Sequence, residues 1–318
     1  MILATTDVRT RFVTQPDHAA LSGRFAEAWG GDGFDPPTPR AAMRLAVHAH
    51  DDGWWPRDRR PQLGPDGTPR DFHELSPARW TRLYRRGIDE VARADPYAGL
   101  LVSLHGAGLR RQRYGLSPSW PDTPRAFRGF VEREGRRQRS LATALREDDD
   151  DDRLSVDDVA LLTELRDAGR PPSGFGAGTD RDPRIWRNYR LLGALDALSL
   201  RICATPTHDP DVGDSGVGEP GIDDSDVDDS DGDESVGGDP IEVPHVPTEP
   251  GRPDAMLTAT PLAGNAYRLD PYPFTTSPVS ATVPVRTVEG TSFPDEETLF
   301  RRYYAADVEE MRVTLRHE

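Results

Sequence analysis

The sequence contains no lysine: all 39 of its basic residues are arginines, set against 55 aspartates and glutamates. The formal net charge of −16 argues against general binding to nucleic acids, because affinity for a phosphate backbone depends on clustered lysine and arginine. An acidic composition without lysine is instead typical of a protein that is solvated in high salt and encoded by a GC-rich genome. We prefer this explanation to an acidic region that recruits a partner, and we expect no nucleic-acid partner.

Cysteine and long apolar runs are also scarce. The single cysteine, Cys203, excludes an internal disulfide and a cysteine-rich zinc site. It lies in the apolar run LLGALDALSLRIC, which favours a buried structural thiol over a nucleophile. No apolar run approaches the roughly 20 residues that a membrane span needs, and MILATTDVRTRF lacks the pattern of a secretory signal. The sequence predicts a cytoplasmic protein that does not associate with a membrane.

Arginine is absent from residues 206–250, which are rich in aspartate, glycine and proline. Such a segment cannot bury enough apolar surface to offset the entropy lost on ordering. Repeated aspartates suggest a calcium loop, but the glycine and glutamate positions of an EF-hand are absent. We therefore expect a disordered acidic linker or insertion over residues 205–252, and a second, short acidic run lies at 146–153.

Helix signals dominate the chain before this linker. Prolines stand where first helical turns can begin, and SVDDVALLTELRDAG opens with a capping pattern and closes at a glycine. The signals predict helices over 17–29, 39–52, 77–93, 96–106, 124–145, 155–168 and 184–203. After residue 253, AMLTATPL, AYRLD and SATVPVRTV predict short strands, and PDEETLFRRYYAADVEEM predicts a helix. We expect a mainly α fold, with a helical domain over 1–204 and a small α+β segment over 253–318 packed on it.

Several polar side chains fall on the apolar faces of these helices. His50 continues the apolar stripe of helix 39–52 and Asp51 lies at its edge, whereas His48 lies about 200° away around the helix. His18, His105 and Asp196 continue the apolar stripes of three other predicted helices. Taken singly, each of these residues has an ordinary structural explanation: a histidine hydrogen-bonded in the core, or an aspartate paired with an arginine. An aspartate would need such a partner because an unpaired buried carboxylate is costly. Together, imidazole and carboxylate groups suit a divalent transition metal.

Two resemblances follow from these residues. His18, then His50 and Asp51 in AVHAHDDGW, then Asp196 in LLGALDALSL resemble the HD superfamily of metal-dependent phosphohydrolases. The pattern of that superfamily is a histidine, an adjacent His-Asp that closes a helix before a glycine, and a distant aspartate. More closely, TQPDHAALSG, AHDDGW, LLVSLHGAGL, NYRLLGALDALSLRIC and LDPYPF together resemble an uncharacterised prokaryotic family catalogued as a domain of unknown function. This second resemblance covers nearly the whole chain apart from its acidic segments.

The first resemblance implies an HD-domain-like helical bundle that binds a divalent ion (Mn, Fe, Co, Ni, Zn or Mg) through His18, His50, Asp51 and Asp196. The implied activity is hydrolysis of a small phosphoester by a metal-activated water, which Asp51 helps to orient. His105 could protonate the leaving oxygen, bind substrate or ligate a second ion.

The substrate pocket is less well defined by the sequence. Trp54, Arg57 and His73 are candidate substrate-binding residues. For Trp54, core packing is the preferred explanation. A hydrogen-bonded loop explains His73 equally well, and other arginines, such as Arg110 to Arg113, could bind phosphate. His208, His245 and His317 lie in linker or tail and are expected to be solvated. The alternative to an enzyme is a non-catalytic helical sensor or small-ligand-binding module that retains the buried His/Asp cluster.

Overall fold

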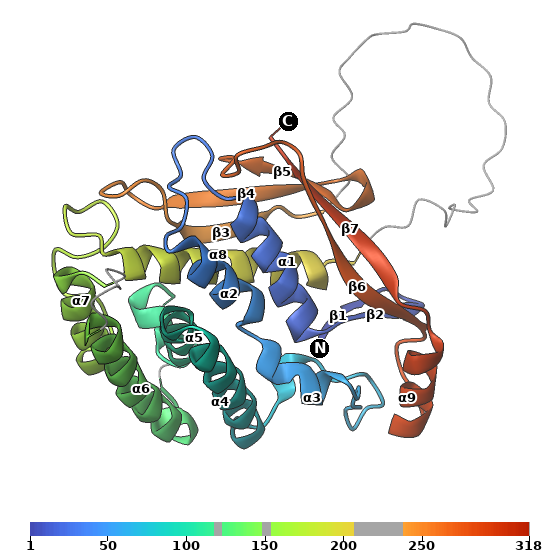
Figure 1. Ribbon diagram of the computed structural model, residues 1–318. Helices are drawn as coiled ribbons and strands as arrows, with labels where there is room; N and C mark the ends of the chain where they lie inside the picture. Colours follow the sequence, from blue (N-terminus) through green and yellow to red (C-terminus); the bar gives the residue numbers. More distant parts are fainter. Residues whose placement is uncertain (118–122, 148–153, 207–237, 318) are drawn as a thin grey trace, which may run out of the picture.

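Figure 1 shows the computed structural model, which describes residues 1–117, 123–147, 154–206 and 238–317. These residues form an α+β fold in which helices pack against a seven-stranded sheet of order β1-β2-β6-β7-β5-β4-β3. The expectation of a mainly α, HD-like helical bundle with a small C-terminal appendage is therefore wrong. Strands from both ends of the chain build one sheet, which provides a large part of the surface on which the helices pack.

The sheet joins the first residues of the chain to the last. Strand β2 pairs antiparallel with β6, and this pairing places Arg9 opposite Glu289 and Phe12 opposite Arg286. Paired strands of the described sheet are antiparallel except β5 and β7, which are parallel. The strands are β1 (Ile2–Thr5), β2 (Arg9–Val13), β3 (Ile241–Val246), β4 (Ala255–Leu262), β5 (Ala266–Asp270), β6 (Val279–Glu289) and β7 (Glu309–Arg316).

The helices confirm most of the predicted segments, with ends that differ by a few residues. The main differences are at helix 39–52, which ends earlier, and at the C-terminal helix, whose last predicted residues belong to β7. The helices are α1 (Gln15–Ala28), α2 (Arg40–Ala49), α3 (Trp55–Asp58), α4 (Pro77–Ala94), α5 (Pro96–Gly108), α6 (Arg128–Glu147), α7 (Val156–Asp167), α8 (Arg184–Ala204) and α9 (Glu296–Ala305).

Helices α1 and α8 lie between the sheet and other helices (Figure 1). Helix α1 contacts β6, and α8 contacts β1 and β3. Away from the sheet, both α1 and α8 contact α2, and α8 also contacts α5. One apolar core runs through these layers, and a smaller one, which includes Met1, Phe12 and Leu299, lies beneath α9. Because α1 and α8 are covered from two sides, polar residues on their inner faces are enclosed by protein.

The expected acidic linker falls mostly on residues 207–237, which lie outside the described residues, as do residues 148–153 of the shorter acidic run. The end of the expected linker is ordered as β3, an edge strand of the sheet. An edge position tolerates Pro244, which has no backbone N–H to donate, and the pairing shifts between Val243 and Val246 as in a β-bulge. None of the helices within the described ranges combines the length and the apolar character that crossing a membrane requires.

Candidate metal centre

Three helices bring four of the sequence-predicted residues together in the core. Small residues allow the close approach of α1 to its neighbours, because a Cβ on Gly23 would lie 2.9 Å from His48 Cβ on α2. On the side of α8, the hydroxyls of Ser22 and Ser199 are 2.6 Å apart. His18, one turn before Ser22, therefore faces Asp196, and both side chains are buried. His50 is the C-cap residue of α2 and is buried beside them.

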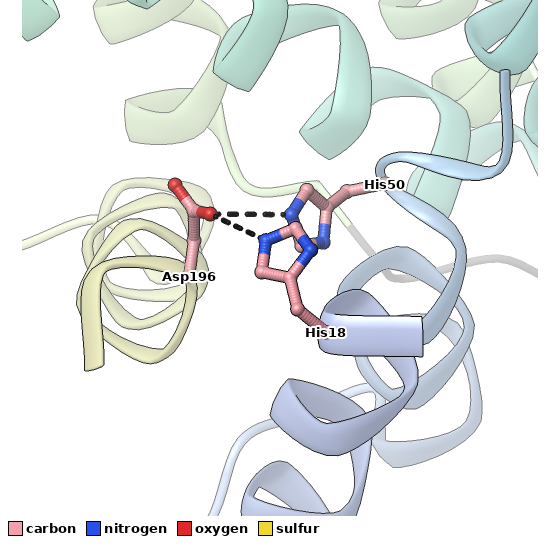
Figure 2. Close-up of side chains that lie close together, drawn as sticks. All are labelled: His18, His50 and Asp196. Atoms are coloured by element: carbon pink, nitrogen blue, oxygen red, sulfur yellow. Dashed lines mark hydrogen bonds and ion pairs between the residues drawn. The ribbon is translucent and has the colours of Figure 1, made fainter. Parts of the chain in front are cut away.

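The two imidazoles point at the same carboxylate oxygen (Figure 2). The Nε2 atoms of His18 and His50 lie 3.2 Å and 3.4 Å from Asp196 Oδ1. Asp51 Oδ2 lies 4.0 Å from the Nε2 of His18 and 3.8 Å from that of His50. Four side chains thus direct nitrogen and oxygen atoms at one small volume of the core.

Each histidine is oriented by its other ring nitrogen. His18 Nδ1 is 2.5 Å from Gln15 O, and His50 Nδ1 is 2.8 Å from Val47 O. A ring N–H that donates to a backbone carbonyl fixes the tautomer and leaves Nε2 with a lone pair, which is the usual arrangement of metal-ligating histidines. The helical backbone around each residue therefore prepares both Nε2 atoms as ligands.

The spacing of these atoms fits one divalent ion. Two ligands with bonds of about 2.1 Å stand about 3.0–3.4 Å apart when the angle between them is roughly 90–109°. The separations of 3.2 Å and 3.4 Å from Asp196 Oδ1 match this range. Asp51 lies farther from the histidines and stands outside the group of three residues whose ligand atoms lie within 4.8 Å of one another. In addition, Asp51 Oδ1 is buried without a hydrogen-bond partner among the described residues. A buried polar atom left unpaired beside the cluster is what a bound ion or its water would satisfy.

Burial and mutual charge shift the protonation of the cluster in opposite directions. Burial alone would lower the pKa of His50, but the charges of Asp51 and Asp196 raise it to about 9. Burial alone would raise the pKa of Asp196, but hydrogen bonds from His18 and His50 hold it well below its usual range. For Asp51 burial prevails and the pKa is raised. Without an ion, the cluster therefore retains protons that a divalent cation would displace.

His105 on α5 lies at the outer side of Asp196. Its Nε2 is 3.7 Å from Asp196 Oδ2, and its ring centroid is 5.1 Å from that of His50. Burial lowers the pKa of His105 to about 3, so that its imidazole is neutral at pH 7. Arg113 approaches the same Oδ2 atom, with Nη2 at 3.6 Å. Asp196 thus directs Oδ1 at the two other histidines and Oδ2 at His105 and Arg113.

A pocket opens beside this end of the cluster. Its walls come from α5, the turn after α5, α8 and strand β3. The lining residues are His105, Leu109, Arg113, Leu116, Ser117, Tyr189, Arg190, Gly193, Ala194, Ala197, Val243, Pro244 and His245. Because His105 belongs both to this lining and to the surroundings of Asp196, the pocket provides an approach to the cluster.

The turn that carries Arg113 has an unusual backbone. Gln112, Arg113 and Tyr114 have φ angles of 52°, 46° and 55°, and Gly115 follows with 91°. Left-handed backbone costs roughly 1–2 kcal/mol for each residue other than glycine. The buried ring of Tyr114 anchors the turn, since it packs edge-on against Tyr189 with centroids 5.5 Å apart. The fold thus holds three consecutive residues in a costly conformation beside the cluster.

The side chains of the three predicted substrate-binding residues make their contacts outside the cluster, although the backbone N–H of Trp54 donates to Asp51 O. Trp54 is buried and packs edge-on against Phe72 and Tyr84, which fits the core-packing alternative. Arg57 donates to Arg70 O. His73 lies in a short 3₁₀ turn (Phe72–Glu74) with its side chain 68% exposed. His48 is exposed, as its helical phase predicts.

His245 was missed by the sequence-based reasoning. It was expected to be solvated in the linker, but it lies half-buried in β3 and lines the pocket. It too has a left-handed backbone, with φ of 60°. The alternation of Ile241 and Val243 just before it is the signal of a strand, and the neighbouring acidic residues and prolines obscure that signal.

One comparison with known proteins gives a match. The family model described as "Protein of unknown function (DUF3891)" matches residues 1–290. No curated protein and no solved structure matches the chain.

Proposed function

The chain belongs to the DUF3891 family of proteins of unknown function, and we propose that it is a metal-dependent hydrolase of small phosphoesters. The observation that carries the proposal is the convergence of His18, His50 and Asp196, whose ligand atoms all lie within 4.8 Å of one another in the buried core. The resemblance of these residues and Asp51 to the ligand pattern of the HD superfamily supports the same conclusion.

The four buried side chains would hold the ion. A divalent ion supplies Lewis acidity, lowers the pKa of a bound water and polarises a phosphoryl oxygen. Asp51 Oδ1, which has no hydrogen-bond partner among the described residues, would orient the attacking water. His105 is neutral at pH 7 because its pKa is about 3, so it can accept a hydrogen bond or a proton. In that state His105 lacks the proton that a general acid must donate. The role of a general base or of a ligand to a second metal ion suits this residue better.

A phosphoester is the preferred substrate class for two reasons. Arg113 and His105 meet at Asp196 Oδ2, on the side where the pocket opens. An arginine beside a metal ion can bind and polarise the oxygens of a phosphoryl group. The HD-like ligand set is the second reason.

Metal content tests the proposal directly. Purified protein should carry about one divalent ion per chain by elemental analysis, as one His/Asp centre implies. His50→Ala and Asp196→Ala should lose the ion, whereas the exposed control His48→Ala should retain it. With manganese in high salt, the wild type should hydrolyse members of a panel of nucleotides, phosphomonoesters and phosphodiesters, and Asp51→Ala should not. Absence of both metal and turnover in the wild type would refute the proposal.

A non-catalytic sensor or small-ligand-binding module remains the second candidate. The observation that favours it is the contact of Arg113 with Asp196 Oδ2 at 3.6 Å, because an arginine can neutralise a buried carboxylate without any metal. Metal binding without turnover on the panel would favour this module. Loss of metal only in the His48→Ala variant would instead show that the helix faces have been assigned wrongly.

A further inference from the structure

Left-handed backbone outside glycine is concentrated at one pocket. Among the described residues, positive φ angles at non-glycine positions occur at Gln112, Arg113, Tyr114, His245 and Asn265. Arg113 and His245 line the pocket beside Asp196, and Gln112 and Tyr114 flank Arg113 in the chain. Strained backbone persists only where surrounding structure enforces it, and it gathers at sites that bind or react. Two separate segments of the chain therefore hold costly conformations beside the same pocket.

The first segment aims Arg113 at the cluster. The left-handed turn is closed by backbone hydrogen bonds from Tyr114 N to Arg111 O and from Ser117 N to Gln112 O. Within it, Arg113 reaches across to α8, where Nη1 donates to Gly193 O at 3.4 Å and Nη2 approaches Asp196. The guanidinium thus spans the pocket wall beside the proposed metal centre, with 19% of the side chain exposed.

The second segment brings His245 to the same pocket. Strand β3 carries a bulge between Val243 and Val246, where the ladder with β4 shifts. A bulge re-aims side chains and is common next to functional sites. His245 lies within this bulge and joins Arg113 in the lining, although 132 residues separate the two in the chain.

The charge of the lining stands out against the whole chain. The protein has a formal net charge of −16, yet the lining contains two arginines, two histidines and no acidic residue. One of these arginines, Arg190, is neutralised by a bidentate contact with Asp182, at 2.9 Å and 2.8 Å. Arg113 also approaches a carboxylate, but at the longer distance of 3.6 Å between Nη2 and Asp196 Oδ2, so Arg113 and His245 are the better candidates to meet a ligand anion. Leu109, Leu116 and Val243 provide apolar walls beside them.

We propose that Arg113 and His245 form an anion-binding subsite that takes the phosphate group of a substrate whose apolar part lies against the leucines. The proposal deepens and rests on the proposed function, because the subsite adjoins the metal centre through Asp196 and His105. Arg113 contributes charge and a planar pair of N–H donors, which match two oxygens of a phosphate. Neither residue ligates the metal, so the subsite and the metal centre can be disabled separately.

Inorganic phosphate is the probe, and its binding to the full chain is measured by calorimetry with and without Mn²⁺. Arg113→Gln should weaken phosphate binding by about tenfold or more, and His245→Gln by roughly threefold, as expected for loss of one charged and one polar contact. Arg187→Gln removes the same charge from α8 outside the pocket lining and should change phosphate binding by less than about twofold. Mn²⁺ should bind all of these variants at least as well as it binds the wild type.

The outcomes separate this proposal from the proposed function. Mn²⁺ binding by the wild type together with equal phosphate affinity in wild type and Arg113→Gln would overturn the subsite and leave the metal centre standing. A wild type that binds no phosphate in either condition would also overturn it. Phosphate binding that depends on Arg113 in a wild type that binds no Mn²⁺ would uphold the subsite and refute the metal centre. If Arg113→Gln does not fold, two other variants still test the subsite. Arg113→Lys keeps the charge but loses the paired donors, and His245→Gln removes the second group.

Discussion

Gly53 links the proposed metal centre to the packing of the helices, and its replacement by alanine should disrupt both. The residue follows Asp51 and Asp52 in a 3₁₀ turn (Asp52–Trp54) that packs on α4. A Cβ built on Gly53 would lie 2.1 Å from Leu83 O and 2.9 Å from Gly87 N. Both are backbone atoms of α4, so no side-chain rotation can relieve the clash. The turn and the helix must move apart instead.

The size of the effect follows from these distances. A carbon and a carbonyl oxygen in contact are about 3.3 Å apart, so the turn and α4 must separate by roughly 1 Å. Overpacking of a well-packed interior costs about 1–3 kcal/mol and occasionally more. We expect Gly53→Ala to lose about 3 kcal/mol, which lowers the midpoint of thermal unfolding by roughly 4–5 °C in a chain of 318 residues. Because Asp51 lies two residues before Gly53, Mn²⁺ affinity should also fall.

Alanine substitutions at two other glycines serve as comparisons, with the free energy of unfolding of each variant measured by urea and thermal unfolding. A Cβ on Gly87 would lie 3.0 Å from Gly53 N, so Gly87→Ala should cost less than Gly53→Ala. Gly129 is exposed on α6 with no atom within 4 Å of its Cβ position, so Gly129→Ala should stabilise the protein by about 0.5–1 kcal/mol through helix propensity. A Gly53→Ala variant as stable as Gly129→Ala, with unchanged Mn²⁺ affinity, would contradict the close contact between the turn and α4.

Three further predictions concern other parts of the molecule. Burial raises the pKa of the Cys203 thiol to about 12, so a thiol reagent should react with this residue only at the rate of unfolding. Fast reaction in native buffer would show that the helix core is open. Burial raises the pKa of Glu134 despite its contacts with Arg137 and Ser103, so the wild type loses stability relative to Glu134→Gln as pH rises from about 4 to 7. A urea series in which the wild type gains stability relative to Glu134→Gln over that range would contradict this sign. Gln112→Gly should leave the free energy of unfolding unchanged or raise it by up to about 1 kcal/mol, because glycine relieves the left-handed strain but gains entropy in the unfolded chain. A clear loss of stability would mean that the Gln112 side chain is needed there.

The helices were predictable because their signals are local. The Ser155 capping box opens α7 as the sequence predicts, since Ser155 Oγ accepts from Asp158 N and Ser155 N donates to the Asp158 carboxylate. The sheet was not predictable in the same way, because its pairing is not local. Thr10 donates its hydroxyl to Gly290 O, 280 residues away, and no pattern within β1 or β2 specifies that partner. Strand β7 does carry a local signal, the alternation of Met311, Val313 and Leu315, but the preceding helical pattern masks it.

For the site, helical phase was more informative than neighbourhood in the sequence. Residues on the inner faces of separate helices, such as His18 and Asp196, meet in space although 178 residues separate them. Trp54 and Arg57 follow His50 closely in the chain, yet the turn after α2 leads them to contacts with Tyr84 and Arg70. The bulge that brings His245 to the pocket depends on pairing with β4, so its role required the sheet.

The cluster and the pocket combine two costly features at one place. Protein interiors are mostly apolar, and non-glycine residues mostly avoid left-handed backbone. Other parts of the fold show one of these features at a time, as in the buried Glu134 and the positive φ of Asn265. Here two carboxylates are buried among histidines, and Arg113 and His245 both have positive φ. A structural cluster could meet its packing needs with apolar side chains at lower cost, because replacing buried ion pairs by hydrophobic residues is often neutral or stabilising. Backbone strain and buried charge are instead expected together at a site that binds a ligand. A ligand that binds only the folded state stabilises it, and this free energy offsets the cost of the strained and buried groups.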